Sequence, residues 1–230
     1  MVKAVLFDID DTLLSFDGYV REAMKSGFAR FGLCEYDDYM LDVFHKTNSG
    51  LWHSLERGEL SFEELIKIRW NMIFANLGIS ADGVEFEKYF REYLFDSAIV
   101  IDGAEELLEH LNGRYILCAA SNGPYGQQVN RLEKSGLSKY FSHLFISGEI
   151  GHQKPSAEFF ETCLTRINAQ GESIRPEEMM IVGDSLTSDM AGGLGFGMQT
   201  CLYNPKHSPI PDETRIDFVV YDLREIKNIL

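Results

Sequence analysis

The stretch Lys3-Ala4-Val5-Leu6-Phe7-Asp8-Ile9-Asp10-Asp11-Thr12 decides the fold. Its first half is a short apolar run typical of a buried strand, and its second half brings aspartates to the end of that strand. Side chains alternate along an extended chain, so Asp8 and Asp10 are expected on the same side, where they suit proton transfer or metal binding. Thr12 is expected to support the turn by a hydrogen bond to the backbone.

Composition excludes several classes of partner. The 230 residues include 36 acidic and 21 basic side chains, which give a net charge of −15. We therefore expect neither a nucleic acid polymer nor an anionic membrane surface as a partner. The four scattered cysteines lack metal-site spacing, and no apolar run has the length of a membrane span. These features favour a cytoplasmic protein.

Helical periodicity dominates from about Asp17 to Leu94, with no convincing strand. Ser61 followed by Glu64 predicts a capping box, and Gly78 falls where a helix should stop. The sequence therefore predicts an all-helical domain of four or five helices at 16–96, inserted into a core formed by 1–15 and 97–230.

Strand and helix patterns alternate from about Asp102 onward. Apolar runs at 115–120, 143–146, 179–182, 198–202 and 218–220 are separated by helical segments. Such alternation predicts the α/β class, with a doubly wound parallel sheet of Rossmann-like type. Ligands of these sheets bind at the carboxyl ends of the strands.

Polar residues gather at those predicted strand ends. Asp8 and Asp10 follow the first strand, and Asp184 follows the strand at 179–182, with Asp189 shortly after. Several carboxylates at one edge require a compensating cation, and hard oxygen ligands that leave room for water and phosphate suit Mg²⁺. With a metal in place, Asp8 can be ligand and nucleophile, and Asp10 a proton carrier.

A second set of polar residues is suited to anion binding. Ser121 and Asn122 follow the strand at 115–120 and offer a hydroxyl, an amide and backbone N–H groups. Lys154 precedes Pro155, which restricts its backbone to extended conformations and can aim the ammonium inward. Taken singly, each of these residues also fits an ordinary loop or surface role.

Four segments together resemble the motifs of the haloacid dehalogenase (HAD) superfamily of phosphohydrolases, in order and spacing. They are Phe7-Asp8-Ile9-Asp10-Asp11-Thr12-Leu13, Ser121-Asn122-Gly123, Lys154-Pro155, and Gly183-Asp184-Ser185 with Asp189. The resemblance spans the whole chain, and the helical insertion resembles the mobile cap of that superfamily.

The resemblance implies a role for each matching residue. Asp8 would attack phosphorus and form an aspartyl-phosphate, while Asp10 would protonate the leaving oxygen and later deprotonate water. Mg²⁺ (or Mn²⁺) would be held by Asp8, the backbone carbonyl of Asp10, and Asp184, with Asp189 in support directly or through water. The phosphoryl oxygens would be held by Ser121, Asn122 and Lys154.

A finer resemblance is to the pyrimidine 5′-nucleotidases that clear noncanonical nucleoside monophosphates. It rests on Asn48-Ser49-Gly50-Leu51-Trp52, on the run from Gln127 to Leu137, and on Ile146-Ser147-Gly148-Glu149-Ile150-Gly151. The implied substrate is a small phosphate monoester, and the implied enzyme is a phosphoric monoester hydrolase of the 5′-nucleotidase type. The sequence leaves open whether the protein is a monomer or a homodimer. Phe16, Asn48 and Trp52 are candidates for contacting a base or sugar.

Two alternatives remain open. Within the enzymes, the substrate could be a sugar phosphate or another small metabolite; a carbon–halogen hydrolase fits less well because that branch lacks the second aspartate. Outside the enzymes, a phospho-accepting signalling domain also uses an acceptor aspartate, a hydroxyl and a Lys-Pro pair on a doubly wound sheet. Such domains are shorter, however, and place the acceptor after their third strand.

Overall fold

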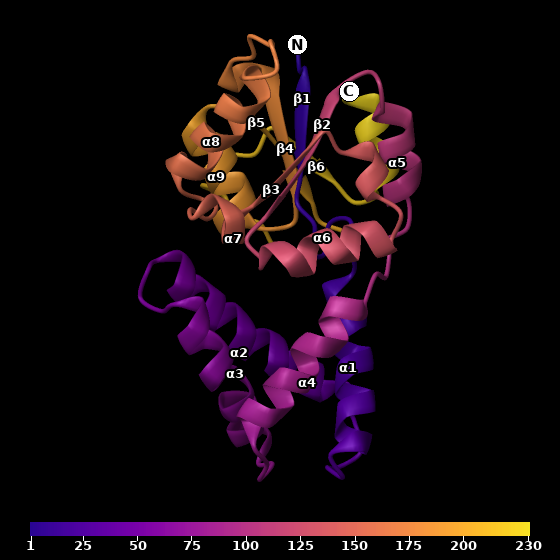
Figure 1. The fold of residues 1–230 in the computed structure, drawn as a ribbon, viewed down its shortest axis with the longest axis vertical. Helices are drawn as coiled ribbons and strands as arrows, with labels where there is room; N and C mark the ends of the chain where they lie inside the picture. Colours follow the sequence, from indigo (N-terminus) through magenta and orange to yellow (C-terminus); the bar gives the residue numbers. More distant parts are fainter. The chain divides into compact units, whose positions relative to one another are not determined.

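The computed structural model describes all 230 residues and divides the chain into two compact units (Figure 1). The core unit comprises Met1–Ser15 and Ala98–Leu230, and the helical unit comprises Phe16–Ser97. None of the helices is long and apolar enough to cross a membrane.

The core unit is built on one six-stranded, all-parallel sheet, which confirms the predicted fold class. Its strands are β1 (Ala4–Phe7), β2 (Ile116–Ser121), β3 (His143–Ile146), β4 (Met179–Gly183), β5 (Gln199–Tyr203) and β6 (Phe218–Val220). They are arranged in the order β3-β2-β1-β4-β5-β6. The strand order reverses between β1 and β4, and ligands of such sheets bind at this switch point.

Helices cover both faces of the sheet because alternate side chains of each strand point to opposite faces. One apolar core joins Val5 and Phe7 of β1 to α5 (Ala104–Leu111), α6 (Tyr125–Lys134) and the 3₁₀ helix η4 (Leu223–Asn228). The other joins Ala4 and Leu6 to α8 (Ala157–Asn168) and its neighbours. The remaining short elements are η1 (Ser138–Tyr140), α7 (Ser147–Ile150), η2 (Pro176–Glu178), the π-helical turn η3 (Leu186–Met190) and α9 (Ala191–Phe196).

The helical unit consists of four helices, α1 (Phe16–Arg30), α2 (Tyr39–Glu56), α3 (Phe62–Leu77) and α4 (Gly83–Asp96). An aromatic-rich core centred on Trp70 holds them together. The predicted capping box is confirmed, because the Ser61 hydroxyl accepts from the Glu64 amide while the Glu64 carboxylate accepts from the Ser61 amide. Gly78 ends α3 in the left-handed conformation, as predicted.

Two adjacent segments of the core unit lead to the helical unit. Leu14 and Val100 form an antiparallel bridge. The Ser15 amide donates to the Ile99 carbonyl over 2.8 Å, and the Ile101 amide donates to the Leu13 carbonyl over 2.9 Å. The outgoing and returning chains therefore lie side by side, a few residues beyond Asp10.

Candidate active site

Strand pairing brings the two principal aspartates to the same edge of the sheet. Phe7, the last residue of β1, pairs with Val182 of β4, and the Asp8 amide donates to the Val182 carbonyl over 2.8 Å. Asp8 and Asp184 thus follow neighbouring strands at the switch point, where parallel strands end together.

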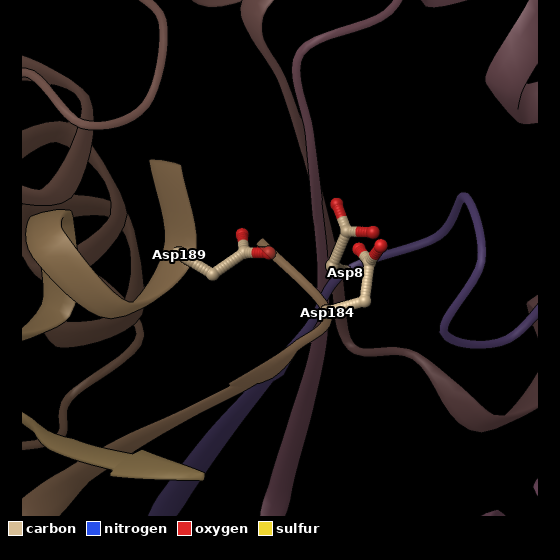
Figure 2. Close-up of side chains that lie close together, drawn as sticks. All are labelled: Asp8, Asp184 and Asp189. Carbon is tan, nitrogen blue, oxygen red and sulfur yellow. The ribbon is translucent and has the colours of Figure 1, made fainter. Parts of the chain in front are cut away.

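Three carboxylates meet at this edge. One oxygen each of Asp8, Asp184 and Asp189 lie within 4.8 Å of one another. Figure 2 shows Asp8 beside Asp184, with the Asp189 carboxylate reaching toward them from the helical segment after β4. Asp8 and Asp189 are buried, whereas Asp184 is open to solvent. A cation can therefore enter the cluster from the side of Asp184.

The buried side chain of Lys154 contacts the cluster through its ammonium group. The side chain is only 1% exposed, and Nζ donates to Asp8 over 2.6 Å, to Asp189 over 2.7 Å and to the Ala120 carbonyl over 2.7 Å. An ammonium has three protons, so these bonds employ all of them. Lys154 consequently orients Asp8, and a phosphoryl oxygen would reach Nζ only by exchanging with one of these partners.

Asp189 connects the helix side of the cluster to its centre. Its Oδ1 accepts from Lys154, and its Oδ2 accepts from the Ser185 amide over 3.1 Å. Gly183 makes this approach possible, because a Cβ atom at Gly183 would lie 2.2 Å from Asp189 Oδ2. A side chain at Gly183 is therefore incompatible with the observed position of Asp189.

Burial and mutual repulsion set the protonation of the cluster. Burial raises the pKa of Asp8 to about 7, although Lys154 opposes this effect. The pKa of Asp184 is raised as well, because its carboxylate is only partly hydrated beside the cluster even though the residue is exposed, and because Asp8 repels its charge. Burial alone would lower the pKa of Lys154, but the Asp189 and Asp8 carboxylates outweigh it and the pKa is raised. The lysine is thus charged, and the aspartates are poorly compensated.

The donor set fits a divalent cation. When all three carboxylates are ionised, the single ammonium leaves two negative charges uncompensated. The available ligands are oxygen atoms, one of them solvent-exposed, which is the chemistry that Mg²⁺ prefers when it keeps several waters and binds a phosphate. A bound cation would also favour the ionised form of Asp8.

Ser121 and Asn122 have different local roles. Ser121, the last residue of β2, accepts at Oγ from Gln128 Nε2 over 2.7 Å and from the Gly123 amide over 3.3 Å. The Asn122 side chain instead pairs with the main chain of Lys154, donating to its carbonyl over 2.8 Å and accepting from its amide over 2.7 Å. Asn122 therefore fixes the loop that carries Lys154, while direct phosphate binding by its amide stays a prediction.

Asp10 is held by two residues that sequence reasoning missed. Its Oδ1 accepts from Arg131 Nη1 over 2.6 Å, and its Oδ2 accepts from Gln128 Nε2 over 2.7 Å. Both partners lie on α6 and are buried. The available signal was a glutamine and an arginine at i, i+3 beside the apolar Leu132, on the inner stripe of a helix.

The predicted role of the Thr12 hydroxyl is wrong. Thr12 is buried, and its Oγ1 has no hydrogen-bond partner. The turn is closed by the backbone instead: the amides of Leu13 and Leu14 donate to the Ile9 carbonyl over 2.9 and 2.8 Å, and the Asp11 amide donates to the Leu14 carbonyl. Asp11 takes a left-handed conformation with φ of 57°, which aspartate tolerates better than most residues.

The three residues suggested for base or sugar contact do not form one cluster in the helical unit. Phe16 is half-buried, with its ring 5.5 Å from that of Tyr19. Trp52 lies near Phe62 in a separate small cluster. Asn48 is buried and accepts a hydrogen bond from Arg69 over 3.1 Å. Their contact with a substrate stays a prediction.

Comparisons with known proteins agree with this geometry. A family model of haloacid dehalogenase-like hydrolases matches residues 2–197. Pyrimidine 5′-nucleotidase PynA of Streptococcus pneumoniae is 35% identical over 234 residues, covering 99% of this chain and 97% of the relative. Pyrimidine 5′-nucleotidase YjjG of Escherichia coli is 26% identical over 228 residues, covering 98% and 96%.

A solved structure extends the similarity to three dimensions. The HAD-hydrolase YfnB of Bacillus subtilis is 32% identical over 228 residues, covering 99% of this chain and 95% of the relative. The magnesium-bound crystal structure of YfnB matches with a TM-score of 0.90, covering 100% of this chain and 98% of that one.

Proposed function

Because the chain belongs to the haloacid dehalogenase-like hydrolases, we propose that it is a Mg²⁺-dependent phosphatase of pyrimidine nucleoside 5′-monophosphates. The proposed chemistry rests on one observation: Asp8 lies at the end of β1 with one carboxylate oxygen hydrogen-bonded to Lys154 and with Asp184 and Asp189 beside it. Family membership and the two pyrimidine 5′-nucleotidase relatives make the chain a phosphoric monoester hydrolase. The metal, the covalent intermediate and the base preference are the inferred parts.

In the first step, the Asp8 oxygen that Lys154 does not bind attacks the phosphorus atom. A bond forms between this oxygen and phosphorus, and the bond from phosphorus to the leaving oxygen breaks. Asp10, whose carboxyl group is one-third exposed, gives its proton to the leaving oxygen, and the nucleoside departs as an alcohol. Lys154 holds the nucleophile in a fixed orientation, which lowers the entropic cost of attack.

In the second step, a water molecule attacks the phosphorus atom of the aspartyl-phosphate. Asp10, now ionised, takes a proton from that water, and the bond from phosphorus to the Asp8 oxygen breaks. Inorganic phosphate leaves, Asp8 is a carboxylate again, and Asp10 carries the proton needed for the next cycle. The buried ammonium of Lys154 stabilises the Asp8 carboxylate as it is released.

Mg²⁺ would be held by Asp8, Asp184 and the backbone carbonyl of Asp10, with Asp189 in support, and it would neutralise the charge that accumulates on the phosphoryl oxygens. The surplus negative charge of the cluster supports this assignment. A dianionic phosphate would be repelled by the carboxylates alone, so substrate affinity should depend on the metal.

The proposal for the substrate rests on the two relatives that are named pyrimidine 5′-nucleotidases. We infer that the helical unit acts as a cap that selects the leaving group, with Phe16, Asn48 and Trp52 as the candidate contacts. A planar pyrimidine favours an aromatic side chain for stacking and an amide for its polar edge.

The test is phosphate release from UMP, dUMP, dTMP, purine monophosphates and hexose phosphates, with Mg²⁺, Mn²⁺ or EDTA. Asp8→Asn is the variant that removes the nucleophile, and Glu161→Gln on the exposed face of α8 is the matched change from carboxylate to amide. We expect kcat/KM to be highest for the pyrimidine nucleotides, activity to vanish in EDTA and in Asp8→Asn, and Glu161→Gln to behave as wild type.

Other outcomes would separate the parts of the proposal. Preference for hexose phosphates would leave the chemistry in place and refute the nucleotide assignment. A phosphorylated Asp8 that persists without turnover of any monoester would favour the signalling alternative. The intermediate itself is detected by acid quench and borohydride reduction, which converts an aspartyl-phosphate to homoserine at position 8.

A further inference from the structure

Both carboxylate oxygens of Asp10 accept hydrogen bonds from side chains of α6. Arg131 donates to Oδ1 and Gln128 donates to Oδ2, over 2.6 and 2.7 Å. The two α6 residues also bind each other, since Arg131 Nη1 donates to Gln128 Oε1 over 2.8 Å. We call this pair the Gln128–Arg131 clamp.

The clamp is costly to bury, which argues against a role in packing alone. Gln128 and Arg131 are fully buried, whereas the Asp10 side chain that they bind is 34% exposed. Apolar side chains at the same two positions would attach α6 to the sheet without the loss of hydration that a guanidinium and an amide suffer. A role in orienting Asp10 would account for the burial of these two polar side chains.

The orientation of the Gln128 amide follows from Arg131. A guanidinium can only donate, so the Gln128 atom that faces it must be the acceptor Oε1. Nε2 therefore faces the other way, where its two protons reach Asp10 Oδ2 and Ser121 Oγ, each over 2.7 Å. Arg131 thus determines that Gln128 donates to both site residues.

This arrangement also gives a direction to the Ser121 hydroxyl. Ser121 Oγ accepts from Gln128 and from the Gly123 amide, which occupies both of its lone pairs. The hydroxyl proton must then point away from both donors, and it is available to an anionic oxygen. Likewise, a proton on Asp10 is excluded from the side of the clamp, where two donors already point, and must lie on the exposed side of the carboxyl group.

We propose that Gln128 and Arg131 are positioning residues that aim the proton of Asp10 at the leaving oxygen and the hydroxyl of Ser121 at the phosphoryl group. The inference rests on the proposed function, because Asp10 must be the proton donor of a phosphatase. It adds two residues to the site and one link, through Gln128, between proton transfer and phosphate binding.

The test compares two leaving groups. The p-nitrophenolate of p-nitrophenyl phosphate departs without protonation, whereas the alkoxide of the best nucleoside monophosphate requires a proton. For Arg131→Met and Gln128→Leu, we expect kcat/KM to fall at least about tenfold more for the nucleotide than for the aryl ester. This difference is a part of the about 10²- to 10⁴-fold that general acid catalysis contributes as a whole. Arg131→Lys, which keeps a charged donor, should recover part of the loss.

A second variant disturbs the clamp without removing a polar group. A Cβ at Gly123 would lie 2.8 Å from Gln128 Nε2, so Gly123→Ala should displace the amide and reproduce the selective loss. Gly126→Ala is the matched control, because a Cβ at that exposed position of α6 has no neighbour within 4 Å. Thermal unfolding of each variant shows whether the fold is retained.

Epistasis provides the decisive measurement. In an Asp10→Asn background, Arg131→Met should cause no further loss for the nucleotide beyond what it causes for the aryl ester, because the residue acts through Asp10. The inference would be overturned if Arg131→Met lowered kcat/KM equally for both substrates, or if its selective loss for the nucleotide added to the loss caused by Asp10→Asn. An active wild type and an inactive Asp8→Asn variant would still support the proposed function in that case. If Asp8→Asn retains activity, the proposed function fails, and this inference fails with it.

Discussion

Gly183→Ala is a severe test of the site geometry because it adds one methyl group and removes nothing. The new Cβ would lie 2.2 Å from Asp189 Oδ2 and 2.4 Å from its Cγ, whereas ordinary contacts begin at 3.4 Å. The Asp189 carboxylate must therefore move by about 1 Å. Its bonds to Lys154 at 2.7 Å and to the Ser185 amide at 3.1 Å do not survive such a shift.

The expected losses follow from these contacts. Overpacking costs about 1–3 kcal/mol, and a lost hydrogen bond between charged groups costs about 1.5–3 kcal/mol, so the free energy of unfolding should fall by roughly 2.5–6 kcal/mol. For a chain of this size, that corresponds to a decrease in Tm of roughly 5–24 °C. Lys154 then loses one of the two carboxylates that orient it, and a displacement of about 1 Å at a reacting centre costs on the order of 10²-fold in kcat.

The assay measures Tm and phosphate release for Gly183→Ala and for Gly195→Ala. A Cβ at Gly195, an exposed position of α9, has no neighbour within 4 Å, so alanine should be neutral or should stabilise the helix. Wild-type Tm and kcat in Gly183→Ala would refute the reasoning, because Asp189 could not then be held where the structure has it. Equal losses in both variants would point to a general intolerance of the segment.

Three further predictions concern charge. In EDTA, Tm should fall as pH rises from about 4 to about 7, because folding raises the pKa of Asp8 from 3.8 to about 7 and the folded state therefore binds the Asp8 proton more tightly than the unfolded chain does. Asp8→Asn should make Tm less dependent on pH, and an unchanged slope in this variant would contradict the assignment to Asp8. Mg²⁺ at 100 times its Kd should stabilise the wild type by about 2.7 kcal/mol, while Asp184→Asn should require a higher Mg²⁺ concentration for the same gain in Tm; an identical Mg²⁺ titration would exclude Asp184 as a ligand. In the helical unit, Arg69→Met should lower the free energy of unfolding in denaturant by about 3–5 kcal/mol, because it leaves the Glu87 carboxylate buried without its bidentate partner. Arg57→Met at an exposed ion pair should leave the free energy of unfolding unchanged, and similar effects of the two changes would contradict the burial argument.

The sheet and the edge that carries the site were predictable because both depend on local sequence. Strands buried on both faces are short apolar runs, and the residues after them emerge at one edge whatever the details of packing. Asp8, Asp184 and Ser121 were found by this rule, and each follows or ends a strand of the observed sheet.

Side-chain partners were not predictable in the same way. Gln128 and Arg131 are long polar residues on a helix, which ordinarily face solvent, and only the packing of α6 buries them against Asp10. Asn122 pairs with the main chain of Lys154, 32 residues away, a contact that no local pattern announces. The Thr12 hydroxyl was expected to close a turn that backbone bonds close without it.

The bridge between Leu14 and Val100 and the hydrogen bonds around it hold the two ends of the helical insertion side by side on the core unit. Any insert whose own ends lie together can be attached there, because the closure cost grows only slowly with the length of the insert. Exchange of the insert would leave β1, Asp8 and the residues around them undisturbed. Under the proposed function, this architecture separates two evolutionary tasks, since the choice of leaving group can diversify in the inserted helical unit while the catalytic residues of the core unit stay the same.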